Sequence, residues 1–428
     1  MRGVERGYVK FKVTFETSII FKKIVLITLI ACILLVGGSL TGQPIKAAST
    51  PSGIIHSVPV TINNSESTST GSNFQQLITV NSNNYYTYEA SNLQNVEFFD
   101  SSGSVIPSWL ESGSDSSSSS RFWVKLANGI PAYSSVTIYM GFASTSTNLF
   151  DSYTVGKAAS SSDSTYGQYD NGANIFSFYD NFAGSSLGSK WSVLNSAGTY
   201  TVSNGITITG SGTDWESIGS TSTFNPQAKV FDTSAYFSTL SSSGPKCFAG
   251  WTPPYGSSST PQYYIGDTSS SYSLYNFAND GSSTTATGNA ISGGSTYSYN
   301  VWSVWAGTSA SYAALVYGSK TSNSQNFVSS TSAAVGLASQ STIYVQWARV
   351  RNLPPNGVMP TVSFGSMTDD SAPTVTIYSP TIDGLTVTVS GNVAPPPSAL
   401  SVGVGETAQV QAAAFQKLTP TITQAHTL

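Results

Sequence analysis

Residues Arg121–Leu126 read RFWVKL, and this pattern decides the fold class. Apolar Phe122, Val124 and Leu126 alternate with the residues between them, which is typical of an antiparallel strand with one face on a hydrophobic core. Similar short runs recur from residue 55 to residue 366, separated by clusters of Ser, Gly, Asn and Pro, without the periodicity of an amphipathic helix. The sequence therefore predicts an all-β protein.

The strand-like runs fall into successive groups that predict separate domains. The first group has the length of a small β-sandwich, and the second, of roughly 190 residues, predicts a larger jelly-roll sandwich of two sheets. The final residues are too few for a complete immunoglobulin-like sandwich of about 100 residues. The predicted order is a signal peptide or membrane anchor at 1–48, the small sandwich at 52–145, a Ser-rich linker at 146–169, the larger sandwich at 170–366, a linker at 367–373, and a partial immunoglobulin-like module or irregular tail at 374–428.

The composition excludes several classes of function. Of 428 residues, 77 are Ser and 47 are Thr, whereas charged residues make up only 9%. The hydrophobic fraction of 39% is large enough to build cores, which excludes a wholly disordered chain. The chain contains only His56 and His426 as imidazoles, which leaves little material for imidazole bases or metal sites. The acidic balance and the lack of a basic patch argue against nucleic-acid binding.

The N-terminal segment predicts export. Lys22 and Lys23 precede the apolar run IVLITLIACILLV at residues 24–36, and small residues follow near Ala48. This is the order of a cleaved secretory signal. An uncleaved anchor is the alternative, because residues 24–45 lack charge and are long enough to cross roughly 30 Å of hydrocarbon. Either way the chain would touch a membrane only through this segment, and everything after residue 49 would be exported.

Several blocks of the first sandwich resemble the family called domain of unknown function 2341. The resemblance rests on blocks within 52–145, namely Val58–Asn64, Phe74–Val80, Val96–Asp100, Ile106–Ser112, Phe122–Leu126 and Thr137–Gly141. The family occurs in exported and surface proteins and brings no established active residues. The resemblance therefore implies a β-sandwich domain at the cell surface.

The second sandwich resembles concanavalin A-like lectin and glucanase domains. The resemblance rests on Phe178–Phe182, on Lys190–Trp191 and on the hairpin around Asn204–Gly205. The combination of the two domains is similar to archaeal cell-surface proteins. This implies a carbohydrate-recognition domain on an exported protein.

Aromatic side chains near flexible loops are the candidate carbohydrate ligands. We expect Trp251 and Tyr255 to present rings from the loop WTPPYG, because Pro253–Pro254 stiffens it. Trp302 and Trp305 should lie on opposite faces of one strand, and Trp305 is the second candidate. Asn63, in the sequon NNS, is the predicted site of N-glycosylation.

No catalytic residues are assigned from the sequence. Glycosidases need two carboxylates flanking the scissile bond. The nearest approach to such a pair is Asp214 and Glu216, which should share one strand face. No cofactor is expected, although Asp180 or Asp267 could contribute to a structural calcium site.

The leading functional hypothesis is an exported cell-surface binding or adhesion protein with a lectin-like carbohydrate-recognition domain and no catalysis. Its partners would be glycans or other cell-surface proteins. A structural envelope or filament-associated protein is the alternative, and a glycoside hydrolase is the second alternative. Exposed aromatic rings on a sheet face would favour the first hypothesis, a hydroxyl-lined face the second, and a carboxylate pair in a groove the third.

The scarcity of charge also suggests a hypothesis about the surroundings of the protein. Stability is lost in acid mainly through carboxylates that must be protonated. A surface of Ser, Thr, Asn and Tyr has few such groups. We therefore expect the exported part to tolerate acid.

Overall fold

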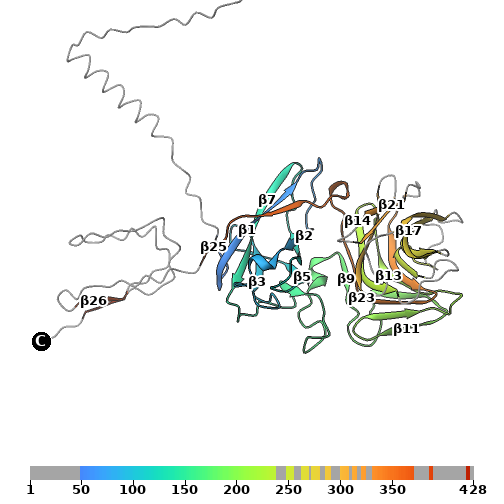
Figure 1. Ribbon diagram of the computed structural model, residues 1–428, viewed down its shortest axis with the longest axis horizontal. Helices are drawn as coiled ribbons and strands as arrows, with labels where there is room; N and C mark the ends of the chain where they lie inside the picture. Colours follow the sequence, from blue (N-terminus) through green and yellow to red (C-terminus); the bar gives the residue numbers. More distant parts are fainter. Residues whose placement is uncertain are drawn as a thin grey trace, which may run out of the picture. The chain divides into compact units, whose positions relative to one another are not determined.

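The computed structural model describes residues 49–237, 247–254, 262–268, 271–279, 285–290, 299–307, 311–315, 320–323, 330–370, 385–388 and 421–424 (Figure 1). The expected signal or anchor lies outside these residues, as does most of the predicted C-terminal module. Of that module, the structure describes β26 (Leu385–Thr388) and β27 (Thr421–Gln424), which pair antiparallel. Within the described part of the chain, helices of membrane-spanning length and apolarity are absent.

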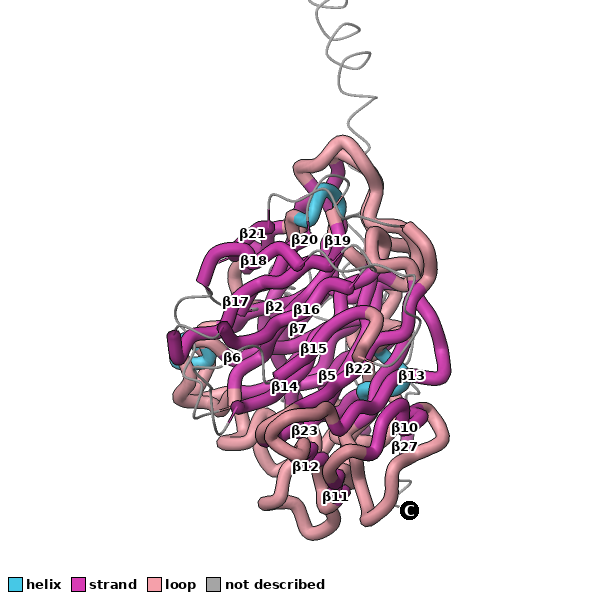
Figure 2. Tube along the Cα trace, turned by 90° about the vertical axis from the view of Figure 1, so that its right-hand side faces the viewer, coloured by secondary structure: helices cyan, strands magenta, loops and turns pink. Residues whose placement is uncertain are grey.

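Almost all of the regular secondary structure in the described chain is β-strand, and the predicted all-β class is confirmed (Figure 2). They form two double-sheet sandwiches, joined by a segment that carries the single turn of helix α2 (Gly172–Ile175). The first sandwich contains the strands β1 (Ile54–Asn64), β2 (Phe74–Val80), β3 (Val96–Phe99), β4 (Val105–Ile106), β5 (Ser108–Ser112), β6 (Ser120–Leu126), β7 (Ser134–Ala143), β8 (Val155–Lys157), β24 (Thr361–Phe364) and β25 (Thr368–Asp369), and the 3₁₀ turn η1 (Ser82–Asn84).

The first sandwich packs a six-stranded sheet against a four-stranded one. The larger sheet has the order β24-β1-β7-β3-β4, with β25 also paired to β1, and the smaller has the order β2-β6-β5-β8. Alternation places Val58, Val60 and Ile62 of β1 opposite Phe122 and Val124 of β6, and these residues share one buried core. The alternation that predicted the strands therefore also identified their core faces.

The chain returns to the first sandwich after it has built the second. Residues 361–364 form β24, which pairs antiparallel with β1 through Val60–Phe364 and Ile62–Val362. The sequence placed residues up to 366 in the second sandwich. Strand propensity alone does not show to which sheet a strand belongs, because the partner is chosen by distant residues.

The second sandwich packs a seven-stranded sheet against an eight-stranded one. The first has the order β10-β13-β22-β15-β16-β17-β18, and the second has the order β11-β12-β23-β14-β19-β20-β21, with β9 paired to β23. Its elements are β9 (Phe178–Asp180), β10 (Trp191–Ser196), β11 (Thr199–Val202), β12 (Ile206–Thr209), β13 (Glu216–Phe224), β14 (Lys229–Phe237), β15 (Cys247–Trp251), β16 (Gln262–Thr268), β17 (Ser271–Asn279), β18 (Thr285–Ala290), β19 (Asn300–Ala306), β20 (Ser311–Leu315), β21 (Lys320–Asn323), β22 (Ala333–Ser339) and β23 (Thr342–Asn352), with the 3₁₀ turn η2 (Pro355–Gly357) after them.

The two sandwiches meet through aromatic side chains. Trp109 on β5 and Trp123 on β6 point away from the core of the first sandwich and are fully buried. They pack with Phe176 of the connecting segment and with Trp347 on β23 of the eight-stranded sheet. The outer face of the small sheet is therefore buried as well, although alternation alone predicts that it faces solvent. We call these four rings and the charged groups among them the junction.

Arg349 of β23 lies at the centre of the junction with none of its side chain exposed. Its Nε donates to Asp232 Oδ2 of β14 at 2.8 Å, and its Nη1 donates to Glu111 Oε2 of β5 at 2.7 Å. The guanidinium carbon lies 4.4 Å from the ring centre of Trp123 and 4.6 Å from that of Trp347. One arginine thus links a carboxylate of each sandwich. Its planar guanidinium can donate to both carboxylates while it stacks on the aromatic rings, which a lysine ammonium group cannot do.

Replacing Arg349 by Met should lower the free energy of unfolding by about 3–5 kcal/mol, because it leaves Glu111 and Asp232 buried without their shared cation. Urea unfolding at neutral pH measures the change. The matched control is Asp369→Asn, which removes a pair with His56 that is largely exposed and should change stability by less than about 1 kcal/mol. Equal effects of the two substitutions would contradict the role given to Arg349.

Two carboxyl groups of the first sandwich are buried and form no ion pair with the residues that the structure describes. Glu89 is 3% exposed and Glu97 is 6% exposed. Burial raises the pKa of Glu89 to about 8 and that of Glu97 to about 7. The unfolded chain has the ordinary pKa, so between about pH 4.5 and pH 8 the folded state binds more protons than the unfolded state. Stability contributed by these groups is therefore full below about pH 4.5 and is lost as the pH rises.

We expect the free energy of unfolding to increase as the pH falls from 8 to about 4.5, in agreement with tolerance of acid. Glu89→Gln and Glu97→Gln should each flatten this dependence and raise stability at pH 8. The two variants should match the unaltered protein near pH 4.5. Denaturant unfolding at several pH values measures this, with Glu66→Gln at a partly exposed position as the control. A stability that rises with pH over this interval would contradict the assignment.

Candidate functional site

The outer face of the eight-stranded sheet is divided into a covered part and an open part. In the covered part, Asp232 accepts from Arg349, Arg351 and Ser303 beneath the first sandwich. Although burial acts to raise the pKa of Asp232, Arg351 and Arg349 hold it below its usual value. In the open part, the same strands β14 and β23 carry polar and aromatic side chains beyond the edge of the junction. The open part is therefore the surface where a ligand can reach this sheet.

Three tyrosines gather on the open part. Tyr236 of β14 and Tyr344 of β23 are cross-strand partners, and their rings stack with centres 4.3 Å apart and an interplanar angle of 9°. Tyr299, which is 43% exposed, stands perpendicular to Tyr236 at 4.9 Å. We call these three side chains the tyrosine platform.

Two phenol groups of the platform, those of Tyr236 and Tyr299, have raised pKa values. Partial burial, followed by the neighbouring Tyr344, raises the pKa of Tyr236. Burial and the same neighbours raise the pKa of Tyr299. The platform therefore offers both an apolar ring surface and hydroxyl groups that can donate and accept.

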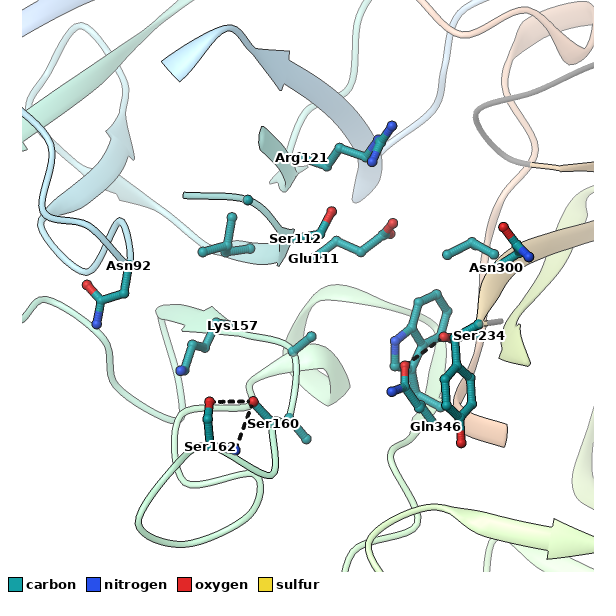
Figure 3. Close-up of a pocket in the computed structure, with 17 residues that line it drawn as sticks. Asn92, Glu111, Ser112, Arg121, Lys157, Ser160, Ser162, Ser234, Asn300 and Gln346 are labelled. Atoms are coloured by element: carbon teal, nitrogen blue, oxygen red, sulfur yellow. Dashed lines mark hydrogen bonds between the residues drawn. The ribbon is translucent and has the colours of Figure 1, made fainter. Parts of the chain in front are cut away.

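A cleft of about 660 Å³ lies between this face and the first sandwich (Figure 3). Ser234, Asn300 and Gln346 line it on the side of the second sandwich, where Ser234 Oγ donates to Gln346 Oε1 at 2.9 Å. The lining residues on the side of the first sandwich and the connecting segment include Asn92, Glu111, Ser112, Arg121, Lys157, Ser160 and Ser162. Hydroxyl, amide and charged groups thus surround a hollow that is continuous with Tyr299 of the platform.

The carboxylate that lines the cleft is already engaged by protein groups. Glu111 accepts from both Trp123 and Arg349 through Oε2. Lys157 pairs with Asp163. Of the described residues that line the cleft, Glu111 is the one with a carboxylate side chain. The hydroxyl and amide groups of the cleft can form hydrogen bonds with a polar ligand.

The tryptophans predicted as ligands lie elsewhere. Trp251 is fully buried in the core of the second sandwich, and its Nε1 donates to Val304 O at 2.9 Å. Its assignment to an exposed loop was wrong, because Trp251 is the last residue of β15 and faces inward before the proline pair begins. Trp302 and Trp305 do lie on opposite faces of β19, but Trp305 is 7% exposed and packs on Val230 and Leu353. Tyr255 lies outside the described residues.

The other candidate residues have structural partners. Glu216 begins β13, is buried, and accepts from the backbone N–H of Gly198 at 3.0 Å, whereas half-buried Asp214 precedes the strand. The expected shared strand face was wrong, because the chain is still in a turn at Asp214. Asp180 accepts from Phe182 N and from Trp191 Nε1.

Of the remaining candidates, the side chain of Asp267 lies outside the described part, and Asn63 is exposed on β1. Clusters of three or more metal-ligating side chains do not occur among the described residues.

Sequence reasoning did not find the tyrosine platform. Tyr236, Tyr299 and Tyr344 stand in unremarkable strand-like runs that are far apart along the chain. The alternation of β14 and β23 gives one usable signal, since Tyr236 and Tyr344 each fall on the face opposite the core residues Phe237 and Ile343. The sequence does not show that β14 and β23 are neighbours, because this depends on the order of the strands in the sheet.

Comparison with known families and proteins supports the first resemblance. The model of the domain of unknown function DUF2341 matches residues 92–194, which extends into the second sandwich beyond the segment where the sequence placed the resemblance. The chain is 40% identical over 124 residues to "Uncharacterized protein 562" of Sulfolobus islandicus rod-shaped virus 1. The match covers 28% of this chain and 21% of that protein, so the chain spans about a fifth of its relative's length.

Several solved structures of carbohydrate-active proteins are similar to about two fifths of the chain. A β-glucanase of Bacillus licheniformis is 10% identical with a TM-score of 0.31, and the match covers 41% of this chain and 97% of the glucanase. The carbohydrate-binding module CBM66 of Bacillus subtilis is 11% identical with a TM-score of 0.30, over 38% and 95% of the two chains.

Trp251→Ala should lower the free energy of unfolding by about 3–5 kcal/mol, because it opens a cavity in the core and leaves the carbonyl of Val304 without its donor. Thermal and urea unfolding measure the loss. Tyr299→Ala, at an exposed position, should change stability by less than about 0.5 kcal/mol. A fully stable Trp251→Ala variant would show that the residue is not part of the core.

Proposed function

We propose that this protein is exported and binds carbohydrate at the cell surface, through the tyrosine platform and the cleft beside it, without hydrolysing its ligand. The platform is the observation that carries the proposal. Sugar rings present apolar C–H faces and hydroxyl edges, so they are bound by aromatic rings together with hydroxyl and amide groups. Aromatic rings on an open sheet face are also the feature that we expect of a binding protein and not of a structural envelope protein.

The cleft supports the same proposal. Ligand sites combine apolar walls with a few fixed polar groups. Here Trp347 and Val301 supply apolar surface, while Ser234 and Gln346 are held together by their hydrogen bond. Glycans, or surface proteins that carry them, are therefore the proposed partners.

The hydrogen bonds that Glu111 already accepts from the protein favour carbohydrate binding over hydrolysis. A glycosidase requires one carboxyl group to donate a proton and a second to act as nucleophile or base. Glu111, the acidic side chain that lines the described cleft, accepts two hydrogen bonds through one oxygen, and one of them comes from buried Arg349. A glycoside hydrolase remains the second candidate function, and it is tested by the same experiment.

Tyr236→Ala and Tyr344→Ala should each weaken binding of a responsive glycan roughly tenfold, which corresponds to about 1.4 kcal/mol. The purified protein is first applied to a glycan array, and affinities of the hits are then measured by calorimetry together with any released sugar. Tyr133→Ala is the matched control, because Tyr133 is 74% exposed on the first sandwich and lies away from the platform.

An array profile that stays the same in both platform variants would refute the proposed site. A profile without any hit would favour the structural envelope hypothesis. Sugar released by the unaltered protein at a rate above background would favour the hydrolase.

A further inference from the structure

A second pocket lies on the other side of the junction from the cleft. On β6, the outward-facing residues are Arg121, Trp123 and Lys125 in order, of which Arg121 lines the cleft, Trp123 fills the junction and Lys125 lines the second pocket. The second pocket has a volume of about 340 Å³. Lys229, at the start of β14, lines it as well. We call it the lysine pocket.

The two ammonium groups of the lysine pocket have neutral partners. Lys125 Nζ donates to Asn174 O at 2.7 Å. Lys229 Nζ donates to Ser177 Oγ at 3.0 Å and to Asn352 Oδ1. An ammonium group has three N–H donors, so these bonds use one donor of Lys125 and two of Lys229. Three donors are therefore left for a ligand or for water.

The lining of the lysine pocket carries positive charge without compensation. None of the described residues that line it has a carboxylate; apart from the lysines they are Ser, Asn, Gln, Ile and Phe residues. The part of the chain after residue 48 has ten basic and nineteen acidic residues, so a pocket with two lysines and no carboxylate departs from its acidic balance. Two of those ten basic residues share this one pocket.

Burial makes the uncompensated charge costly. Lys125 and Lys229 are both half-buried, and burial lowers the pKa of Lys229. An anion in the pocket would offset this cost, because a nearby negative charge favours the protonated amine.

The surrounding backbone is fixed by bonds between the two sandwiches. Gln75 Nε2 donates to Ile175 O at 3.0 Å, and Asn352 N donates to Gln75 Oε1 at 2.9 Å. The pocket is thus held in shape before any ligand enters.

We propose that the lysine pocket binds an oxyanion, namely a carboxylate, sulfate or phosphate group, between Lys125 and Lys229. The group can arrive as a free ion or as a substituent of a larger molecule such as an acidic sugar. The site is distinct from the tyrosine platform. Lys229 and Tyr236 are seven positions apart on β14, which is roughly 23 Å at about 3.3 Å per residue.

Equilibrium dialysis of the full chain against radiolabelled sulfate tests the proposal directly, at constant ionic strength set with chloride. The unaltered protein should bind about one sulfate per chain. Lys125→Gln and Lys229→Gln should each weaken binding roughly tenfold, because each removes one charged donor. Lys190→Gln is the matched control, since Lys190 Nζ donates to Tyr179 O and does not line the pocket.

Competition distinguishes the sources of the oxyanion. Acetate, inorganic phosphate, a sulfated disaccharide and its unsulfated counterpart are each added against labelled sulfate. Displacement by the small ions alone indicates a free ion, and stronger displacement by the sulfated sugar indicates a substituent; both support the proposal.

Absence of sulfate binding to the unaltered protein would overturn the proposal, and this result does not depend on whether the variants fold. Equal binding by all four proteins would also overturn it, as would displacement of sulfate by the unsulfated sugar to the same measurable extent as by the sulfated sugar. Tyr236→Ala should leave sulfate binding unchanged, so failure of the carbohydrate proposal would be seen separately.

Discussion

The contact on which the rest of the structure depends is the one that Arg349 makes with Asp232 and Glu111. A guanidinium buried without counter-charges would be costly to keep folded, and removing it would leave Asp232 with Arg351 as its remaining partner among these cations. Asp232 belongs to the second sandwich and Glu111 to the first, so the charge balance is complete only when the two sandwiches are packed together. The surrounding rings of Trp109, Trp123 and Trp347 exclude water and offer their faces to the cation.

This junction determines where ligands can bind. It covers one part of the eight-stranded sheet and leaves the tyrosine platform open on the neighbouring part. The cleft and the lysine pocket lie on either side of Trp123, because the outward-facing positions of β6 pass from Arg121 through Trp123 to Lys125. The cleft and the lysine pocket therefore both have walls from two domains, and neither would exist in an isolated sandwich.

The burial and pairing of the carboxyl groups agree with the hypothesis, drawn from the composition, that the protein tolerates acid. Few exposed carboxylates are available to lose stabilising partners in acid. Glu89 and Glu97, which are buried without a cation, favour the folded state when they are protonated. Asp232 acts in the opposite direction, because its lowered pKa contributes stability that is lost as the pH falls below about 3.8. We therefore expect the pH of greatest stability to lie on the acidic side of neutrality.

The sequence by itself determined the all-β class, the double-sheet sandwiches and the core faces of strands such as β1 and β6, because a two-residue period is a local property of the chain. It assigned Trp251 to an exposed loop, since it could not show where β15 ends. Only the tertiary structure decided that Trp123 is buried on its outer face, that β24 closes the first sandwich, and that Tyr236 and Tyr344 stack. Each of these depends on which strands become neighbours, and that choice is made by residues far apart in the chain.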